Sequence, residues 1–169
     1  MTVVVTSSEF ARHITPVGHP EATDRVDVIN RALKRSPSLA LSWEAPRAAT
    51  IEELRFCHTE AYLETVLREV GQLLVVAKDL PIRFLSTGDV TICPATFNIA
   101  SLASGAVLTA VDTVMESDTK QAFCPVRPPG HHATASRGMG FCIFNNVAIG
   151  ARYIQKKYNL KRVLIVDWD

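Results

Sequence analysis

The chain has 169 residues, of which 47% are hydrophobic and 21% are charged. This composition is typical of one globular domain and excludes an intrinsically disordered chain. The formal net charge is only +1 at pH 7. Because a nucleic-acid-binding surface needs a clear excess of basic residues, we expect no direct nucleic-acid binding.

The four cysteines, Cys57, Cys93, Cys124 and Cys142, lack the Cys-x-x-Cys spacing of zinc and redox motifs. We interpret them as buried free thiols in a reducing compartment. The N-terminus has no basic leader with a long apolar core, and no window approaches the roughly 20 apolar residues of a membrane span. We expect a soluble cytoplasmic protein without membrane contact, or a nuclear one if the source is eukaryotic.

The first third of the chain alternates apolar runs with helical patterns. Val3 to Val5 predicts an opening strand. An amphipathic helix is expected from Thr23, as its N-cap, to about Arg35. A second strand is expected over residues 39–44. Residues 50–53 read Thr-Ile-Glu-Glu, which is the form of a capping box and predicts another helix start.

A longer helical pattern begins near Thr59. Its apolar positions form one stripe, which we interpret as core: Tyr62, Leu63, Val66, Leu67 and Val70. Residues 80–94 contain two prolines and a glycine and are expected to be irregular. An alanine-rich amphipathic helix is then predicted over residues 97–115.

The last third reads as a strand–helix–strand unit. We predict a buried strand over 121–125, a helix over 146–158 and a strand over 163–166, and we expect Asn145 and Asn146 to cap the helix. Val163 to Val166 is apolar without alternation, which favours a strand covered on both faces of a parallel sheet. The sequence as a whole thus predicts one α/β domain.

Three isolated histidines carry weaker signals. His13 and His19 occur in the loop expected over residues 7–20. Either could ligate a metal, but a lone loop histidine is more often a surface residue, and we interpret both in that way. His58 immediately precedes a predicted helix, and we expect it to cap or pack there.

The strongest functional pattern combines paired histidines with paired aspartates. His131 and His132 follow a Pro-Pro-Gly turn, so they must lie on an irregular loop. Asp167 and Asp169 end the final apolar run. Ligands of open α/β sheets bind beyond the carboxyl ends of the strands. We therefore expect the two pairs to converge on one site.

The motifs Arg-Pro-Pro-Gly-His-His at 127–132 and Met-Gly-Phe-Cys-Ile-Phe-Asn-Asn at 139–146 resemble the zinc-dependent histone deacetylase and acetylpolyamine amidohydrolase superfamily, closest to its class II branch. The resemblance covers nearly the whole chain, with further matches at His19-Pro20-Glu21, Arg25, His58 to Leu63 and Gly88-Asp89. It implies the arginase-like α/β fold, a parallel sheet in three layers. It also implies hydrolysis of acetyl-lysine in proteins or of acetylated polyamines, with Zn²⁺ as cofactor.

The resemblance assigns roles to the paired residues. His132 matches the general base and acid at the metal-bound water, and His131 matches its electrostatic partner, paired with Asp167. Asp169 matches the first zinc ligand. The backbone around the two aspartates matches an internal K⁺ site that much of the family contains.

Four further residues match the substrate channel of the family. Gly140 and Phe141 match its narrow wall, and Asp89 matches the rim aspartate that holds backbone amides of the substrate. Arg25 matches an internal arginine near the acetate exit. Taken without the resemblance, Arg25 reads equally well as a solvated helix charge, and Asp89 as an exposed turn residue that bonds its own backbone.

The match ends at Asp169, where the family continues as Asp-x-Asp-x-His-His-Gly. The chain as given lacks the later histidine and aspartate ligands and the oxyanion-stabilising tyrosine. We expect residues 1–169 to be the N-terminal part of one catalytic domain, incomplete at its C-terminal end and inactive alone. The alternative is a truncated, non-catalytic protein that binds a partner. An arginase-type manganese ureohydrolase shares the fold but matches the tandem-histidine loop poorly.

Overall fold

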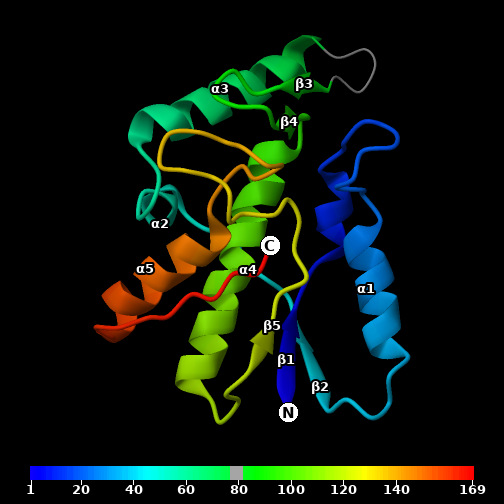
Figure 1. The fold of residues 1–169 in the computed structure, drawn as a ribbon, viewed down its shortest axis with the longest axis vertical. Helices are drawn as coiled ribbons and strands as arrows, with labels where there is room; N and C mark the ends of the chain where they lie inside the picture. The colour runs from blue at the N-terminus through cyan, green and yellow to red at the C-terminus, as the bar shows by residue number, and fades with distance from the viewer. Residues whose placement is uncertain (77–81) are drawn as a thin grey trace.

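The computed structural model describes residues 1–76 and 82–169 and shows a small parallel sheet between helices (Figure 1). Strand β1 (Thr2–Val5) lies between β2 (Leu41–Glu44) and β5 (Ala122–Phe123), and all three run parallel. The three valines of β1 are buried. This burial on both faces explains why the run is apolar at consecutive positions.

Helices α1 (Arg25–Lys34) and α4 (Thr96–Glu116) lie on opposite sides of the sheet (Figure 1). Val26 of α1 and small residues of α4 pack in one apolar cluster with Val3 and Val5 of β1. The predicted parallel sheet between helices is confirmed.

Helix α4 forms the centre of the molecule. Its packing is so close at Gly105 that an added Cβ would lie 1.9 Å from the carbonyl oxygen of Arg47. By length and hydropathy alone α4 could cross a membrane, contrary to the expectation that no window approaches that limit. However, 56% of the relevant window is buried inside the protein. Its apolar character is explained by packing against β1 and α5.

The remaining elements lie around α4. They are η1 (Ser8–Arg12), α2 (Ile51–Leu54), α3 (Glu60–Val76), the antiparallel pair β3 (Arg83–Phe84) and β4 (Thr91–Ile92), and α5 (Asn146–Tyr158). Helix α3 and the β3–β4 pair lie at the upper end of α4, and α5 lies beside its middle and lower part (Figure 1). A second apolar cluster joins α3, the hairpin, α4 and α5. Ile143 and Phe144 are buried in it, so this cluster also holds the segment that precedes α5.

Two helix starts test the capping predictions. The capping box is confirmed, because Thr50 and Glu53 exchange both of its hydrogen bonds. The prediction of Thr23 as an N-cap is wrong: α1 begins at Arg25, and Asp24 at the cap position makes no capping hydrogen bond through its side chain. Val26 in the first turn of α1 is instead buried in the apolar cluster with β1.

The structure corrects three other predictions, two of them on burial. Leu67 is 43% exposed although the rest of its stripe is buried, because it lies at the margin of the apolar face of α3. Strand β5 is exposed rather than buried, since it forms the sheet edge. Within residues 80–94, expected to be irregular, β3 and β4 form a short hairpin; residues 80 and 81 lie outside the described part of the chain.

The cysteines are all free thiols, as predicted. Cys93 and Cys142 are buried, whereas Cys57 and Cys124 are only half-buried. Burial raises the pKa of Cys142 to about 11 and that of Cys124 to about 12. Both thiols therefore stay protonated at neutral pH and are poor nucleophiles.

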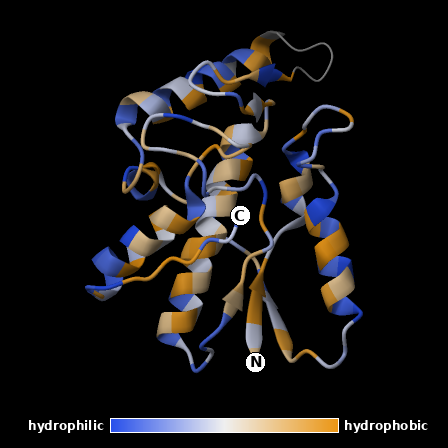
Figure 2. Ribbon diagram, in the orientation of Figure 1, coloured by the Kyte–Doolittle hydropathy of each residue, from blue (hydrophilic) through white to orange (hydrophobic). Residues whose placement is uncertain are grey.

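The strand predicted over Val163 to Val166 is not formed: this segment pairs with no strand in the described part of the chain. It runs as an apolar stretch beside α5 (Figure 2), and Leu164 is 85% exposed. A strand needs a neighbour to satisfy its backbone groups. The strand nearest to Val163–Val166 in sequence is β5, which among the described residues pairs only with β1.

Candidate active site

The tandem histidines lie in the loop that leaves the carboxyl end of β5 and leads to α5. Their ring centroids are 4.1 Å apart. The turn before them packs so tightly at Gly130 that an added Cβ would lie 2.5 Å from the backbone nitrogen of Asn146. A glycine is therefore required where the loop folds back on the start of α5.

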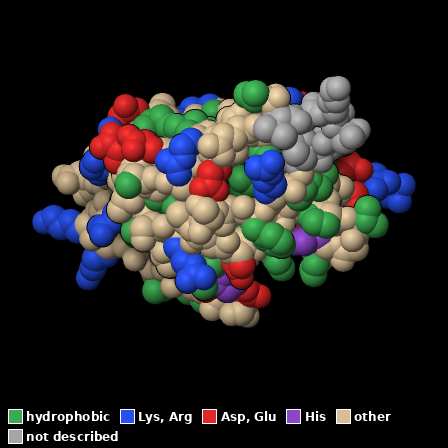
Figure 3. All heavy atoms as spheres, turned by 90° about the horizontal axis from the view of Figure 1, so that it is seen from above, with side chains coloured by type: hydrophobic (Ala, Val, Ile, Leu, Met, Phe, Trp, Pro, Cys, Tyr) green, Lys and Arg blue, Asp and Glu red, His purple; other side chains and the backbone are tan. Residues whose placement is uncertain are grey.

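Both aspartates face the histidines. His131 Nδ1 lies 2.9 Å from Asp167 Oδ2, and His131 Nε2 lies 3.1 Å from Asp169 Oδ2. His132 Nε2 lies 3.2 Å from the same Asp169 oxygen. The expected convergence of the four residues is thus seen, even though the segment carrying the aspartates is not a strand. From above, histidine side chains are visible directly beside acidic ones (Figure 3).

Hydrogen bonds favour the ionised form of Asp167. The backbone N–H of Asp169 donates to Asp167 Oδ1 at 3.2 Å. This bond, followed by the charge and hydrogen bond of His131, lowers the pKa of Asp167 below its ordinary value. Each ring nitrogen of His131 thus faces a carboxylate oxygen, that of Asp167 at Nδ1 and that of Asp169 at Nε2, and such contacts orient the ring.

His131, His132 and Asp169 line one pocket of about 430 Å³. Its walls are Pro20, Glu21, Arg25, Pro129, His131, His132, Gly140, Phe141 and Asp169. Three ligand atoms, one each from His131, His132 and Asp169, lie within 4.8 Å of one another. Imidazole nitrogen and carboxylate oxygen are common ligands of Zn²⁺, so this donor set fits a zinc ion.

The Gly140–Phe141 wall has an unusual backbone. Gly140 has φ +55° and Phe141 has φ +67°, and a non-glycine residue in the left-handed region is uncommon. An added Cβ at Gly140 would lie 2.3 Å from Cδ2 of His132. The Phe141 ring packs edge-on against His19 at 4.6 Å between centroids. Gly140 thus leaves space for the His132 ring, and His19 supports the phenyl wall.

Arg25 reaches the pocket from the first turn of α1. Its guanidinium donates to Glu21 Oε1 at 3.2 Å and to the Val126 carbonyl at 3.0 Å. The interpretation of Arg25 as a solvated helix charge is therefore incomplete, because its side chain hydrogen-bonds the segment that leads into the histidine loop. Arg25 is also one of the residues that line the pocket.

Sequence reasoning missed the buried ion pair behind this pocket. Arg127 is 0% exposed and Glu21 is 5% exposed. The guanidinium donates to both carboxylate oxygens of Glu21, at distances from 2.8 to 3.1 Å. It also donates to the carbonyls of Phe10 and His13. One indication of this pair was present in the sequence: Arg127 begins the Arg-Pro-Pro-Gly motif and Glu21 ends the His-Pro-Glu motif, and both motifs match the family.

Asp89 lies exposed in the turn of the β3–β4 hairpin. Next to it, an added Cβ on Gly88 would lie 1.6 Å from the Gly138 carbonyl oxygen. The hairpin turn is therefore in contact with the loop that contributes Gly140 and Phe141. This places Asp89 beside the pocket wall but outside the pocket lining.

The isolated histidines lie outside the cluster. His13 is buried, contrary to the surface interpretation, and its Nδ1 lies 3.0 Å from Thr96 Oγ1. Burial, with the nearby charge of Arg127, lowers its pKa to about 4. His58 is buried and packed between Tyr62 and Phe144, as expected. His19 is half-buried at the pocket wall.

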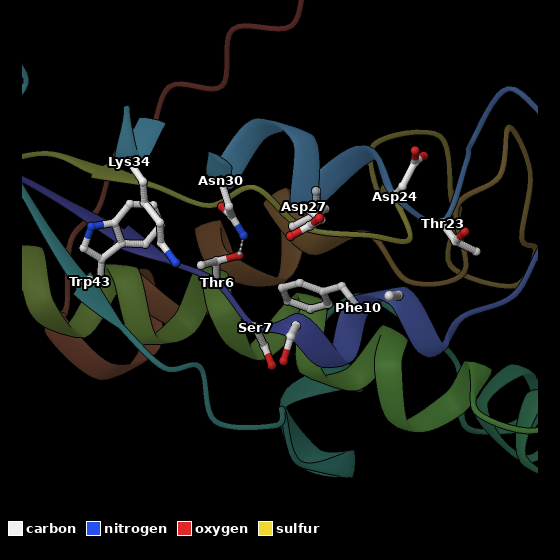
Figure 4. Close-up of a pocket in the computed structure, with 12 residues that line it drawn as sticks. Thr6, Ser7, Phe10, Thr23, Asp24, Asp27, Asn30, Lys34 and Trp43 are labelled. Carbon is white, nitrogen blue, oxygen red and sulfur yellow. Dashed lines mark hydrogen bonds between the residues drawn. The ribbon is translucent and has the colours of Figure 1, made fainter. Parts of the chain in front are cut away.

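A separate cavity of about 550 Å³ lies between η1 and α1, on the side of β1 opposite α4 (Figure 4). Two contacts link its lining residues. Asn30 Nδ2 donates to Thr6 Oγ1 at 3.1 Å, and the Lys34 ammonium lies 5.2 Å from the Trp43 ring centroid. No histidine is among its lining residues in the described part of the chain. We therefore exclude this cavity from the candidate site.

Comparison with known protein families matches residues 19–169 to the histone deacetylase domain. The chain belongs to this family. The resemblance read from the tandem-histidine motif is thereby confirmed.

Individual relatives agree with this assignment. Polyamine deacetylase HDAC10 of Danio rerio is 41% identical over 160 residues, which are 91% of this chain and 22% of that protein. Histone deacetylase 6 of Caenorhabditis elegans is 42% identical over 159 residues, or 89% of this chain and 16% of that protein. An uncharacterized Synechocystis protein is 36% identical over 175 residues and covers 100% of this chain.

The fold has a solved counterpart. The crystal structure of the HDA15 HD domain superposes with a TM-score of 0.78 at 25% identity, covering 92% of this chain and 44% of that one. The deacetylase-like α/β fold is thus confirmed. The chain spans 54% of the Synechocystis protein and about a fifth or less of the other two relatives.

Proposed function

We propose that the protein is a zinc-dependent amidohydrolase that removes acetyl groups from acetyl-lysine of proteins or from acetylated polyamines. The observation that carries this proposal is the convergence of His131, His132 and Asp169 on one pocket, with Asp167 in contact with His131. Two relatives are named as a polyamine deacetylase and a histone deacetylase, which supports these two substrate classes.

Asp169 would hold the zinc ion in this proposal. Zinc at this position would polarise the amide carbonyl and lower the pKa of a water molecule at the site to about 7. A catalytic zinc site takes three protein ligands and keeps one position open. If the two histidines transfer protons and do not bind zinc, this cluster supplies one of the three zinc ligands, Asp169. We therefore propose that residues 1–169 alone are inactive and that the other ligands lie outside the described residues.

The histidines would divide the proton transfers. His132 is half-exposed and lines the pocket, and an imidazole can accept a proton from water and return it to the leaving amine. His131 is held by Asp167 at Nδ1. That contact orients its ring and stabilises a positive charge beside His132.

The pocket wall would select a narrow substrate. Phe141 would flank the methylene chain of the substrate, and Gly140 would leave room beside it. We propose that Asp89 binds substrate amides at the rim and that Arg25 attracts the acetate product. A structural K⁺ ion would bind the backbone oxygens around Asp167 and Asp169, since K⁺ favours carbonyl oxygen ligands.

Zinc content and deacetylation of the whole protein test this function. We expect turnover of an acetyl-lysine peptide or of N-acetylated polyamine, and close to one zinc ion per chain by elemental analysis. Asp169→Asn should lower both zinc content and turnover, because a neutral amide is a weaker ligand than a carboxylate. Residues 1–169 alone should show no turnover. A fully active protein without bound zinc would contradict the proposal.

The close approach at Gly140 leads to a sharper prediction. We expect Gly140→Ala in the whole protein to lower kcat by about 100-fold, because the added Cβ would displace the His132 ring and misplacement by about 1 Å has this effect. Gly18→Ala is the matched control: its φ is +80°, yet no atom lies within 4 Å of the added Cβ. Equal kcat values for the two variants would show that Gly140 does not position His132.

A further inference from the structure

We propose that His58 and Asn145 form a positioning pair that fixes the backbone of the tandem-histidine loop. The inference rests on the proposed function and adds two residues to it. Neither residue touches the pocket. They act through the backbone that carries His131 and His132.

Asn145 uses both ends of its side-chain amide. Its Nδ2 donates to the carbonyl of His131 at 3.2 Å and to that of Ala133 at 2.9 Å. Its Oδ1 accepts from the backbone N–H of Ala148 at 3.1 Å and so caps α5. The opposite orientation of the amide would place its oxygen against two carbonyls and its NH₂ against an N–H. The hydrogen-bond partners therefore define the orientation.

The two accepting carbonyls lie on either side of His132. Both histidines belong to a loop without regular secondary structure, so its backbone groups must find partners elsewhere. Asn145, the residue immediately before α5, supplies two of these partners. It thereby ties the histidine backbone to α5.

His58 in turn holds Asn145. The backbone N–H of Asn145 donates to His58 Nε2 at 2.9 Å, and the ring is only 4% exposed between Tyr62 and Phe144. Burial lowers the pKa of His58 to about 4, so at neutral pH the imidazole is uncharged. Because Nε2 accepts from the Asn145 N–H, the single ring proton lies on Nδ1, which is buried without a hydrogen-bond partner among the described residues. A cationic side chain at this place would have no lone pair to offer.

The N-terminal end of α3 makes two neighbouring contacts with the same segment. Thr59 N donates to the Ala135 carbonyl at 2.9 Å, and the Tyr62 hydroxyl donates to the Ile143 carbonyl at 2.7 Å. His58, Thr59 and Tyr62 thus each hold a backbone group within residues 135–145.

Two substitutions at Asn145 separate positioning from capping. Asn145→Ser and Asn145→Asp keep an N-cap oxygen for α5 but remove the donors to His131 and Ala133. In the whole protein we expect kcat to fall by at least tenfold in both, with KM within about threefold, because the pocket wall is unchanged. Thr50→Ala is the control: it removes the α2 cap, whose hydrogen bonds stay within residues 50–53, and should leave kcat unchanged.

Two substitutions at His58 test the acceptor. His58→Gln can present an oxygen near the position of Nε2 and should keep most of kcat. His58→Leu fills the space without an acceptor and should lose at least tenfold. If kcat fell in Asn145→Asp but not in Asn145→Ser, the added charge would be the cause of the loss. That result would overturn the inference. Equal kcat in His58→Leu and wild type would also overturn it.

Hydrogen exchange supplies a readout that does not depend on activity. We expect faster amide exchange at residues 131–135 in Asn145→Ser and His58→Leu than in Thr50→Ala, with α5 still protected in Asn145→Ser. Unchanged exchange at 131–135 would overturn the positioning role even if the protein proved inactive. An inactive wild-type protein with the expected exchange pattern would instead count against the deacetylase function alone.

Discussion

His132→Ala in the whole protein is expected to lower kcat for deacetylation by about 100- to 10,000-fold, the usual contribution of a general acid–base group. The imidazole faces Asp169 at 3.2 Å and its side chain is 46% exposed. Because few packing contacts are lost, the free energy of unfolding should change little. Steady-state kinetics with an acetyl-lysine peptide, beside urea unfolding, would measure both quantities.

The zinc content of this variant is its control. His132 is proposed to transfer protons and not to ligate the metal, so zinc should remain bound at the wild-type level. A large loss of zinc would make His132 a ligand instead, which its distance to Asp169 also allows. A kcat within about threefold of wild type would contradict any chemical role for this histidine.

Glu21→Ala is expected to destabilise the protein by about 3–5 kcal/mol, the usual effect of removing one partner of a buried ion pair. It leaves the Arg127 guanidinium, which is 0% exposed, without its counter-charge. Urea unfolding of the whole protein at neutral pH measures this loss. The pocket should also be distorted, since Glu21 accepts from Arg25 as well.

Two comparisons make the stability test specific. Glu9→Ala removes an exposed pair with Arg12 and should cost at most about 1 kcal/mol. Adding Arg127→Met to Glu21→Ala should recover part of the loss, because no unpaired charge then remains buried. The recovery will be incomplete, since Arg127 also donates to the Phe10 and His13 carbonyls. A Glu21→Ala effect no larger than that of Glu9→Ala would show that the pair is solvated.

Local elements could be predicted because their causes lie within a few residues. The capping box needs only Thr50 and Glu53, and the β-branched run of β1 needs only its own side chains. The long apolar pattern of α4 likewise repeats within one helix. The strand expected at Val163 to Val166 shows the limit of such patterns. An apolar run favours a strand, but a strand forms only where a neighbour pairs with it.

The sequence by itself determined the family, the tandem histidines and the two aspartates that face them, because those residues form contiguous motifs. Only the tertiary structure decided which distant groups support them. Arg127 meets Glu21 across 106 residues, and Asn145 meets His58 across 87. The burial of His13 likewise depends on α4, which supplies Thr96. A buried hydrogen bond depends on which donor and acceptor the folded chain brings within about 3 Å, and no local pattern specifies that pairing.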